Sequence, residues 1–361
     1  MGVEIVKVIV DGKSWSAFRR VMVRWSFRDA ALAFQIEIAA DQGSTATART
    51  FAAGAEIQIV ANSDLLCHGY VDRYRPRLDE HNRAEITVAG RSKSQDFIDS
   101  SAVHKTGNFR QKTVADIAKA IHGGVKIVTD KNLPKIDYHL TPGENAYRAI
   151  EKITRSQGVW PCGMPDGSIN ITTAGAGRNG SLIEGQNCIT LEADHNWSGR
   201  HSEVIVRGQR PWGHGADALE IEGRARDAAV KRNRPVIVIQ DDDTTKTTAG
   251  KRARHRRDSE AGNSLKAKVK VQGFRDDGGK LWTPGHLSFL QSPFLDIAQD
   301  MAIENVTFSQ DRRSGSETDI ALCDPRALGG GGKARKGGKA GKAWQTDAGA
   351  DADRNYAPDD I

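Results

Sequence analysis

The sequence predicts an α+β fold that is mainly β, in which two similar tube-like β-barrel modules flank a smaller α/β insert. Three observations lead to this class. Apolar residues alternate with polar ones through residues 1–90, a pattern typical of half-buried strands. Helical spacing replaces this alternation within residues 91–185, and the alternation then returns within residues 186–328.

The returning strands repeat the order of the first ones. Matched residues lie at nearly constant separation: Ile36 with Val269, Gly54 with Gly285, and Ile86 with Ile320. An opening strand also recurs, as Val8–Gly12 and Val204–Gly208, at a shorter separation that predicts an additional segment in the later copy. Few residue types are shared, so chance similarity between amphipathic strands is the alternative to a duplicated module.

The first module, residues 1–90, consists of short strands separated by turns rich in glycine and asparagine. The polar segment Asp41–Thr50 predicts a surface loop. The strands expected to build the two barrel walls are Phe34–Ile38 and Ala55–Val60 in the first module, and Lys266–Val271 and His286–Leu290 in the second.

The α/β insert, residues 91–185, contains two amphipathic helices. Apolar residues recur at helical spacing from Val114 to Ile121, and Thr113 is a suitable N-cap. A second helix is predicted within Thr141–Gly158, where Gly158 ends it. A hairpin with its turn at Pro165–Gly167 follows.

The second module, residues 186–328, carries a helical insertion near 224–262. This insertion combines a strand, Pro235–Gln240, with a helix-compatible segment, Thr244–Ala261. Beyond it, residues 329–361 are rich in glycine, lysine and aspartate and have no apolar periodicity. They are predicted to be a disordered tail, because such a composition buries too little apolar surface to order itself.

The chain has a net charge of +6, and much of this excess lies at Lys251–Arg257 and Lys333–Lys342. Runs of this kind predict a solvated helix face and a flexible tail rather than a specific nucleic-acid site. The four cysteines are widely spaced, which predicts neither a disulfide framework nor a zinc site and favours a reducing compartment. No secretory signal or membrane-spanning run is recognised, so we expect no membrane insertion.

Catalytic, cofactor-binding and metal-binding constellations are not recognised in the sequence, which therefore predicts a structural protein and not an enzyme. Gly175, Gly177 and Gly180 have a dinucleotide-like spacing, but the residues that follow read as strand and turn instead of helix. His195 and His201 flank Trp197 without a nearby third metal ligand. We expect no cofactor.

Two other function classes are alternatives. The basic runs would suit a nucleic-acid-binding protein, although aromatic residues for base stacking are not interleaved with them. A cell-wall-active enzyme that degrades carbohydrate or peptidoglycan would need a sugar platform, for which the candidates are Trp160, Trp197, Trp212 and Trp282.

The segment Val88–Ala102 carries a family resemblance. Gly90, Arg91 and Ser92 end a strand, and Asp96-Phe-Ile-Asp99 follows after a short polar stretch. This pattern is similar to the segment in Mu-type contractile phage tails where the first barrel of the baseplate hub passes into its α/β part. The order of the surrounding motifs resembles that family as well, over about residues 1–328, and includes Leu281-Trp-Thr-Pro-Gly-His286.

The resemblance implies a trimeric, pseudo-sixfold ring in the tail baseplate of a virion, assembled in the host cytoplasm. Such a ring joins a hexameric tail tube to a trimeric membrane-piercing spike, as does the similar hub part of T-even phages and type VI secretion spikes. The implied partners are the spike and the tube or tube-initiator protein, with tape-measure and baseplate wedge proteins as further candidates, and specific nucleic-acid binding is not implied. Arg91 and Asp99 are expected to form an ion pair or a cap at the barrel exit.

Overall fold

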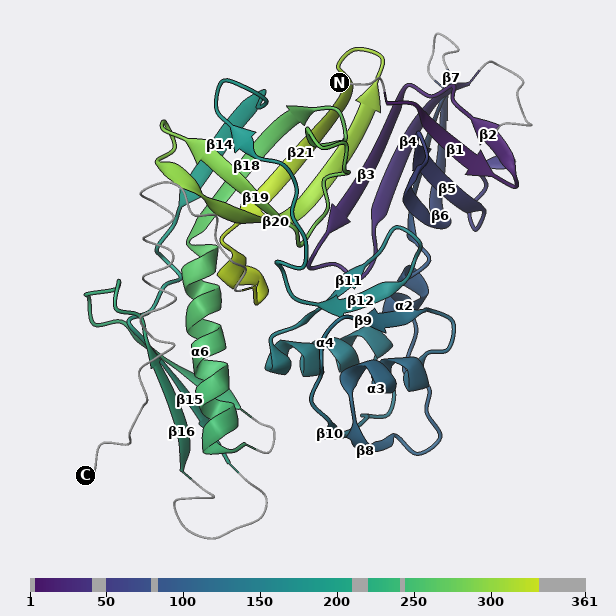
Figure 1. Ribbon diagram of the computed structural model, residues 1–361. Coiled ribbons are helices and arrows are strands. Elements are labelled where there is room, and N and C mark those ends of the chain that lie inside the picture. Colours follow the sequence, from purple (N-terminus) through teal and green to yellow (C-terminus); the bar gives the residue numbers. More distant parts are fainter. Residues whose placement is uncertain (1–3, 41–49, 79–83, 210–219, 241–243, 331–361) are drawn as a thin grey trace.

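The computed structural model describes residues 4–40, 50–78, 84–209, 220–240 and 244–330. The protein is mainly β, and its largest element is a 13-stranded sheet to which both ends of the described chain contribute. Two smaller bodies lie on the same side of this sheet, below it in the view of Figure 1: the α/β insert, and an extension built around one long helix.

The first module contributes seven strands to the main sheet, and their spatial order is β3-β4-β7-β6-β5-β1-β2, with antiparallel neighbours throughout. Apolar side chains alternate along these strands because one face of the sheet is buried. The strands are β1 (Val6–Val10), β2 (Lys13–Trp15), β3 (Arg20–Ser26), β4 (Ala33–Ala40), β5 (Glu56–Ala61), β6 (Asp64–Leu78) and β7 (Ala84–Ser92).

The second module contributes six strands in the order β14-β18-β21-β20-β19-β13, so its first five strands repeat the order β3-β4-β7-β6-β5. The predicted repeat of the strand plan is confirmed at this level. The strands are β13 (Leu182–Ile183), β14 (Thr190–His195), β18 (Leu265–Gln272), β19 (Leu287–Ser292), β20 (Ile297–Asp311) and β21 (Gly315–Cys323).

Local details repeat as well. The strands β6 and β20 each have 15 residues, and β7 and β21 each have 9. Each long strand has one irregular position against its neighbour, at Asp72 in β6 and at Glu304 in β20. Gly54 and Gly285 both have positive φ, and their N–H groups donate to Val71 and Ile303 at 2.7 and 2.8 Å. The same turn therefore leads into β5 and β19.

Two expectations about the modules are corrected. The predicted barrels are not found: among the described strands, no sheet closes into a barrel. Instead, β20 pairs with β3, and the two modules are joined edge to edge in one open sheet. The strand containing Val204–Gly208 is β15 (Glu203–Gly208), which belongs to a separate three-stranded sheet and not to the second module's sheet. The strand in the place of β1, beside β19, is the two-residue β13, and the counterpart of β3 is β14.

The insert has the predicted helices. α3 (Val114–Ile121) begins at a capping box between Thr113 and Asp116, and α4 (Ala146–Gln157) ends at a left-handed Gly158. Around them lie α2 (Gln95–Asp99), β8 (Asn108–Lys112), β9 (Ile127–Thr129), β10 (Ile136–His139), β11 (Trp160–Gly163) and β12 (Ile169–Thr172). The indole N–H of Trp25 donates to the Gly163 carbonyl at 2.7 Å, which ties the insert to β3.

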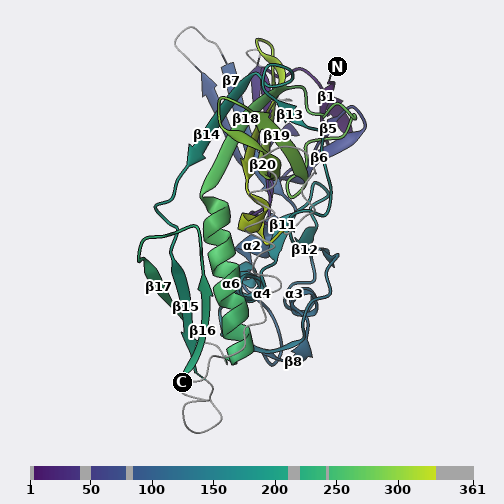
Figure 2. The ribbon, with the colours of Figure 1, turned by 60° about the vertical axis from the view of Figure 1, so that its left-hand side comes forward.

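The extension lies between β14 and β18 and consists of β15, β16 (Ile221–Arg226), β17 (Pro235–Gln240) and α6 (Lys246–Asn263). The helix covers one face of the three strands, as Figure 2 shows from the side. The predicted strand at 235–240 and the predicted helix after residue 244 are therefore confirmed. Residues 331–361, which hold almost all of the predicted tail, and residues 41–49 of the predicted loop lie outside the described residues.

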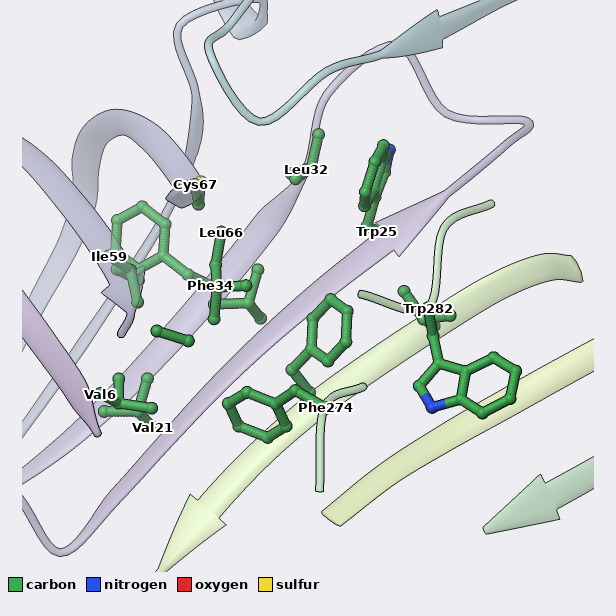
Figure 3. Close-up of a cluster of buried hydrophobic side chains, with 14 of the residues drawn as sticks. Val6, Val21, Trp25, Leu32, Phe34, Ile59, Leu66, Cys67, Phe274 and Trp282 are labelled. Carbon is green, nitrogen blue, oxygen red and sulfur yellow. The ribbon is translucent and has the colours of Figure 1, made fainter. Parts of the chain in front are cut away.

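The largest core is shared by both modules. Figure 3 shows Phe34 and Trp25 of the first module in one cluster with Phe274 and Trp282 of the second. Trp282 retains only 2% of its exposure. A core shared in this way makes the two modules one folding unit at their junction. Among the described residues, no helix has the length and apolarity needed to cross a membrane.

Candidate functional site

The junction between the two modules is the first feature that bears on assembly. The second half of β20 pairs antiparallel with β3, from Asn305 opposite Ser26 to Asp311 opposite Arg20. The apolar pairs Val306–Trp25 and Phe308–Val23 lie within this ladder and are buried. One chain thus contains a complete example of how one module attaches to the next.

The corresponding half of β6 has no such partner among the described strands. β6 pairs with β5 only as far as Tyr70 and with β7 along its length, so one side of residues 73–78 is left open. We call Arg73–Leu78 the β6 edge. Nearly all of its side chains are exposed, and Leu78 retains 63% of its exposure. An exposed apolar residue on an open strand edge is a feature that proteins normally cover.

The counterpart of β3 is open in the same way. β14 pairs with β18, and within the described residues no strand lies on its other side. We call Thr190–His195 the β14 edge. Thr190, Glu192, Asp194 and His195 are exposed, and the neighbouring Ile189 retains 49% of its exposure. The two open edges are thus the counterparts of the two strands that form the intrachain junction.

The face of the main sheet that points away from the core is polar across both modules. Side chains of one parity along β14, β18, β21, β20, β3, β4 and β7 point to this polar face, while those of the other parity are buried in the core. The polar face carries Glu192 and Asp194, Lys266, Lys268 and Lys270, Glu317 and Asp319, Arg20 and Arg24, Glu37, and Arg91.

Charges on the polar face are matched across neighbouring strands. Lys268 lies opposite Glu192 and Lys266 opposite Asp194. The Lys270 ammonium is 3.1 Å from a Glu317 carboxylate oxygen, and this hydrogen bond, reinforced by Asp319, raises the pKa of Lys270. Opposite charges placed directly across a sheet stabilise the pairing and lower the net charge that the surface presents.

Arg91 connects the first module to the insert. Its guanidinium donates to both carboxylate oxygens of Asp99, with the shorter contact at 2.7 Å, and its Nε donates to Asp72 at 2.8 Å. The hydrogen bond from Arg91 lowers the pKa of Asp99, and the two carboxylates raise the pKa of Arg91. The predicted ion pair between Arg91 and Asp99 is confirmed, with Asp72 as a third member that the sequence did not indicate.

The irregular position of the second module, Glu304, also forms an ion pair with an arginine. Glu304 accepts from the Nε of Arg28 at 2.5 Å, and the Lys266 ammonium lies 3.6 Å away. Glu304 has only 12% of its side chain exposed, compared with 36% for Asp72. Both acidic residues therefore pair with an arginine, on β7 for Asp72 and after β3 for Glu304, and the second pair is more deeply buried.

The other candidate residues do not gather into a site. His195 contacts the Leu295 carbonyl and His201 contacts Glu260, and no group of three or more potential metal ligands was found among the described residues. The glycine-rich loop is followed by β13 instead of a helix, as expected. Of the tryptophans proposed as a sugar platform, Trp282 is in the core, Trp160 and Trp197 are each stacked beneath an arginine, and Trp212 lies outside the described residues.

The basic run Lys251–Arg257 lies on α6. Arg256 pairs with Glu260 on the next turn, and Arg257 pairs with Asp258 and donates to the Arg226 carbonyl. Part of the run is therefore used within the extension. The basic run therefore lies on a helix face, as the sequence predicted. Its pairing with Glu260 and Asp258 was not predicted from the sequence.

Comparison with known families gives three consecutive matches. Residues 5–92 match the family described as "Mu phage baseplate assembly protein GpP-like, N-terminal". Residues 94–173 match "Baseplate hub protein gp44-like, second domain", and residues 244–329 match "Mu phage baseplate assembly protein GpP, fourth domain". All three matches are therefore to domains of phage baseplate proteins.

The relatives are phage tail proteins. The chain is 26% identical over 333 residues to the baseplate hub protein gp44 of Escherichia phage Mu, covering 88% of this chain and 87% of that protein. Its fold is shared with the 43 kDa tail protein of prophage MuSo2 from Shewanella oneidensis, at a TM-score of 0.81, 24% identity, and coverage of 90% of this chain and 99% of the other. The chain is a homologue of the Mu baseplate hub protein gp44.

A more distant likeness extends the fold beyond phages. The E. coli c3393 protein is a component of the type VI secretion system with structural similarity to T4 bacteriophage tail proteins gp27 and gp5. Its TM-score with this chain is 0.53, at 11% identity, covering 88% of this chain and 76% of that one. At 11% identity, this similarity is evidence for a shared fold alone.

The sequence reasoning missed the two open edges. A signal was present: basic residues alternate at Arg73, Arg75 and Arg77, and acidic ones alternate at Glu192 and Asp194. Each set reads as the solvent face of a strand when taken alone. Only the strand order reveals that each belongs to an edge whose counterpart in the other module is paired.

Proposed function

We propose that the protein is the structural hub of a contractile tail baseplate, that it assembles as a homotrimeric ring, and that it has no enzymatic activity. The observation that carries this proposal is the repeated strand plan with one open edge at each end. Three chains with two modules each supply six similar module positions, so a threefold ring can match sixfold geometry on one side. The homology to the Mu hub protein supports the baseplate location.

The partners proposed for this ring are a hexameric tail tube, or a protein that starts it, on one side, and a trimeric spike on the other. The likeness to a type VI secretion component that is similar to T4 gp27 and gp5 supports this placement through the fold. Tape-measure and baseplate wedge proteins are further candidates. The site of action is the virion tail, after assembly in the host cytoplasm, without membrane insertion or specific nucleic-acid binding.

We assign the channel wall of the ring to the polar face of the main sheet. The opposite face holds the apolar core and cannot meet water, whereas the polar face is continuous over both modules. Its charges alternate in sign between neighbouring strands, as in Lys268 opposite Glu192. A wall of nearly balanced charge does not bind the contents of the channel tightly.

The mass of the full chain in solution tests the proposal. We expect native mass spectrometry to show three times the chain mass of 39.3 kDa. A monomer at tens of micromolar, with no rise in mass when tube or spike proteins from the same tail are added, would contradict the trimeric hub. A cell-wall degradation assay and a filter-binding titration at two salt concentrations check the enzymatic and nucleic-acid alternatives, because phosphate contacts weaken steeply with salt.

A further inference from the structure

We infer that the β6 edge of one copy pairs antiparallel with the β14 edge of the next copy, in a single register that places Arg75 opposite Asp194 and Arg77 opposite Glu192. This inference rests on the proposed ring and names the surface and the occupant of each open edge. The occupant is a second copy of this chain, because the same chain contains both halves of the junction and shows how such halves join.

The equivalence of the strands determines the register. The irregular positions Asp72 and Glu304 correspond, so Tyr74 corresponds to Val306. Tyr74 pairs with Val88 and Val306 with Ile320, so these two partners correspond as well.

The same comparison extends through β4 and β18 to the edge strands β3 and β14. Val88 pairs with Ile36 of β4, and Ile320 pairs with Val269 of β18. Ile36 in turn pairs with Val21, and Val269 pairs with Leu191. Val21 of β3 therefore corresponds to Leu191 of β14, and every other position along the two strands follows.

The intrachain junction can then be transferred to the open edges. Thr307 pairs with Arg24 inside the chain, and their counterparts are Arg75 and Asp194. Ser309 pairs with Met22, and their counterparts are Arg77 and Glu192, again of opposite charge.

The apolar residues of the two edges also meet in this register. Gln310 pairs with Val21 inside the chain, and their counterparts are Leu78 and Leu191. The exposed Leu78 would be covered in this way, with the exposed Ile189 diagonal to it.

Charge complementarity was not used to obtain the register, so it is independent support. A shift by one residue would place the arginines on the face opposite to the carboxylates, because successive side chains of a strand alternate between faces. A shift by two in one direction would keep only one arginine–carboxylate pair, whereas in the other direction Arg73 and Arg75 would face Asp194 and Glu192. The transferred register is therefore one of two that neutralise both acidic residues of the β14 edge, and the equivalence with the intrachain junction selects it.

Pro76 makes the proposed junction between β6 and β14 weaker than the intrachain junction between β20 and β3. The Phe27 N–H donates to the Glu304 carbonyl at 2.8 Å, so the backbone polar groups of Glu304 face β3. In an antiparallel ladder every second residue of a strand bonds to the same neighbour, so the N–H of Phe308, four residues further on, also points toward β3. Pro76 corresponds to Phe308 and has no N–H, which removes one ladder bond opposite Ala193. A proline also limits indiscriminate pairing of an open edge in the free subunit. The arginine–carboxylate pairs then select the correct partner.

Disulfide trapping in the full chain tests the register. The background is Cys188→Ser, because the other three cysteines are buried. Arg77→Cys with Glu192→Cys places two cysteines directly opposite each other, within the separation that a disulfide spans. The matched control, Arg77→Cys with Thr190→Cys, is displaced by two residues, a diagonal separation of roughly 7–8 Å that a disulfide does not span well.

We expect mild oxidation to give covalent dimers and trimers of the opposed pair on non-reducing electrophoresis. Trimers should be the largest species, because a closed ring uses one bond per junction, and the displaced control should remain mostly uncrosslinked. A ladder beyond the trimer would contradict ring closure. Efficient crosslinking of the control, or none of the opposed pair in a protein of trimeric native mass, would overturn the register and leave the hub proposal standing. A monomeric native mass without crosslinks would overturn both.

Charge exchange provides a second test that does not depend on oxidation. Arg75→Glu with Arg77→Glu, and separately Glu192→Arg with Asp194→Arg, should each lower the trimer fraction roughly tenfold or more, because like charges then face each other. Combining all four substitutions should restore the trimer. Unchanged circular dichroism and thermal unfolding show that each variant folds. Failure of the combined variant to recover, with folding intact, would contradict the pairing of these four residues.

Discussion

The two modules have the same strand order but differ at their outer strands. In the first module, β3 is covered by β20 of the second module, whereas the equivalent β14 has an open side among the strands that the structure describes. The first module also has the β1–β2 hairpin next to β5, whereas the second has only the two-residue β13, parallel to β19. The strand plan repeats closely in the interior, and the differences are concentrated where a module meets a neighbour.

The inserted segments also lie outside the strands that the two modules share. Only a short connection joins β3 to β4, while the equivalent connection from β14 to β18 holds the whole extension with α6. The α/β insert follows β7 at the lower end of the first module (Figure 1). Both additions lie on the same side of the sheet, so a duplicated module could diverge there without disturbing its shared strand ladder.

The largest expected effect compares the closed junction with the open edge. Phe308→Ala removes a buried ring from the intrachain junction and should lower the free energy of unfolding by about 3–5 kcal/mol. Leu78→Ala, on the open β6 edge, should change it by less than about 0.5 kcal/mol in the monomer. Urea unfolding at low protein concentration measures both. Equal effects would mean that the β6 edge is buried within the single chain.

The equivalent glycines provide the next comparison. Alanine at either Gly54 or Gly285 must adopt a positive φ, which costs about 1 kcal/mol. At Gly285 the added Cβ would also lie 2.5 Å from the Phe27 ring, whereas at Gly54 it meets nothing within 4 Å. Gly285→Ala should therefore destabilise by about 2–4 kcal/mol in total. Thermal unfolding of the two variants gives the difference, and a larger loss at Gly54 would contradict it.

Asp72 and Glu304, the acidic residues at the irregular positions, differ in burial. Neutralising them should therefore lower the free energy of unfolding by different amounts. Glu304→Gln leaves the partly buried Arg28 without a charged partner and should cost about 1–3 kcal/mol. Asp72→Asn acts on a more exposed pair, which Asp99 also supports, and should cost less than about 1 kcal/mol. Chemical denaturation at pH 7 compares them. The reverse order would show that burial does not decide the strength of these pairs.

The smallest effect concerns acid stability. The hydrogen bond from Arg91 lowers the pKa of Asp99, so the stabilisation by this pair is complete above the unfolded pKa of about 3.9 and is lost as pH falls through the lower folded pKa. Asp99→Asn should therefore be slightly less stable than the parent protein at pH 7, and the difference should shrink as pH falls below about 3.9. Melting temperatures across this range test the convergence, and a constant difference would contradict it.

Much of the fold could be predicted from the sequence because its signals are local. The helix after Thr113, the end of α4 at Gly158 and the hairpin at Pro165–Gly167 each depend on a few neighbouring residues. The opening strand of the second module was assigned wrongly because Val204–Gly208 has the same apolar alternation as Val8–Gly12. Alternation reports that a strand is half-buried and does not report which sheet contains it.

The sequence by itself determined the periodicities, the turns, the caps and the repeated order of strands, because each of these depends on residues close together in the chain. Only the tertiary structure decided that β20 pairs with β3, that the sheet is open, and that Arg75 and Asp194 lie on two unmatched edges. Pairing between strands hundreds of residues apart depends on a shared core and on backbone groups that are alike in every residue. Side-chain patterns therefore limit the choice of partner strands without specifying it.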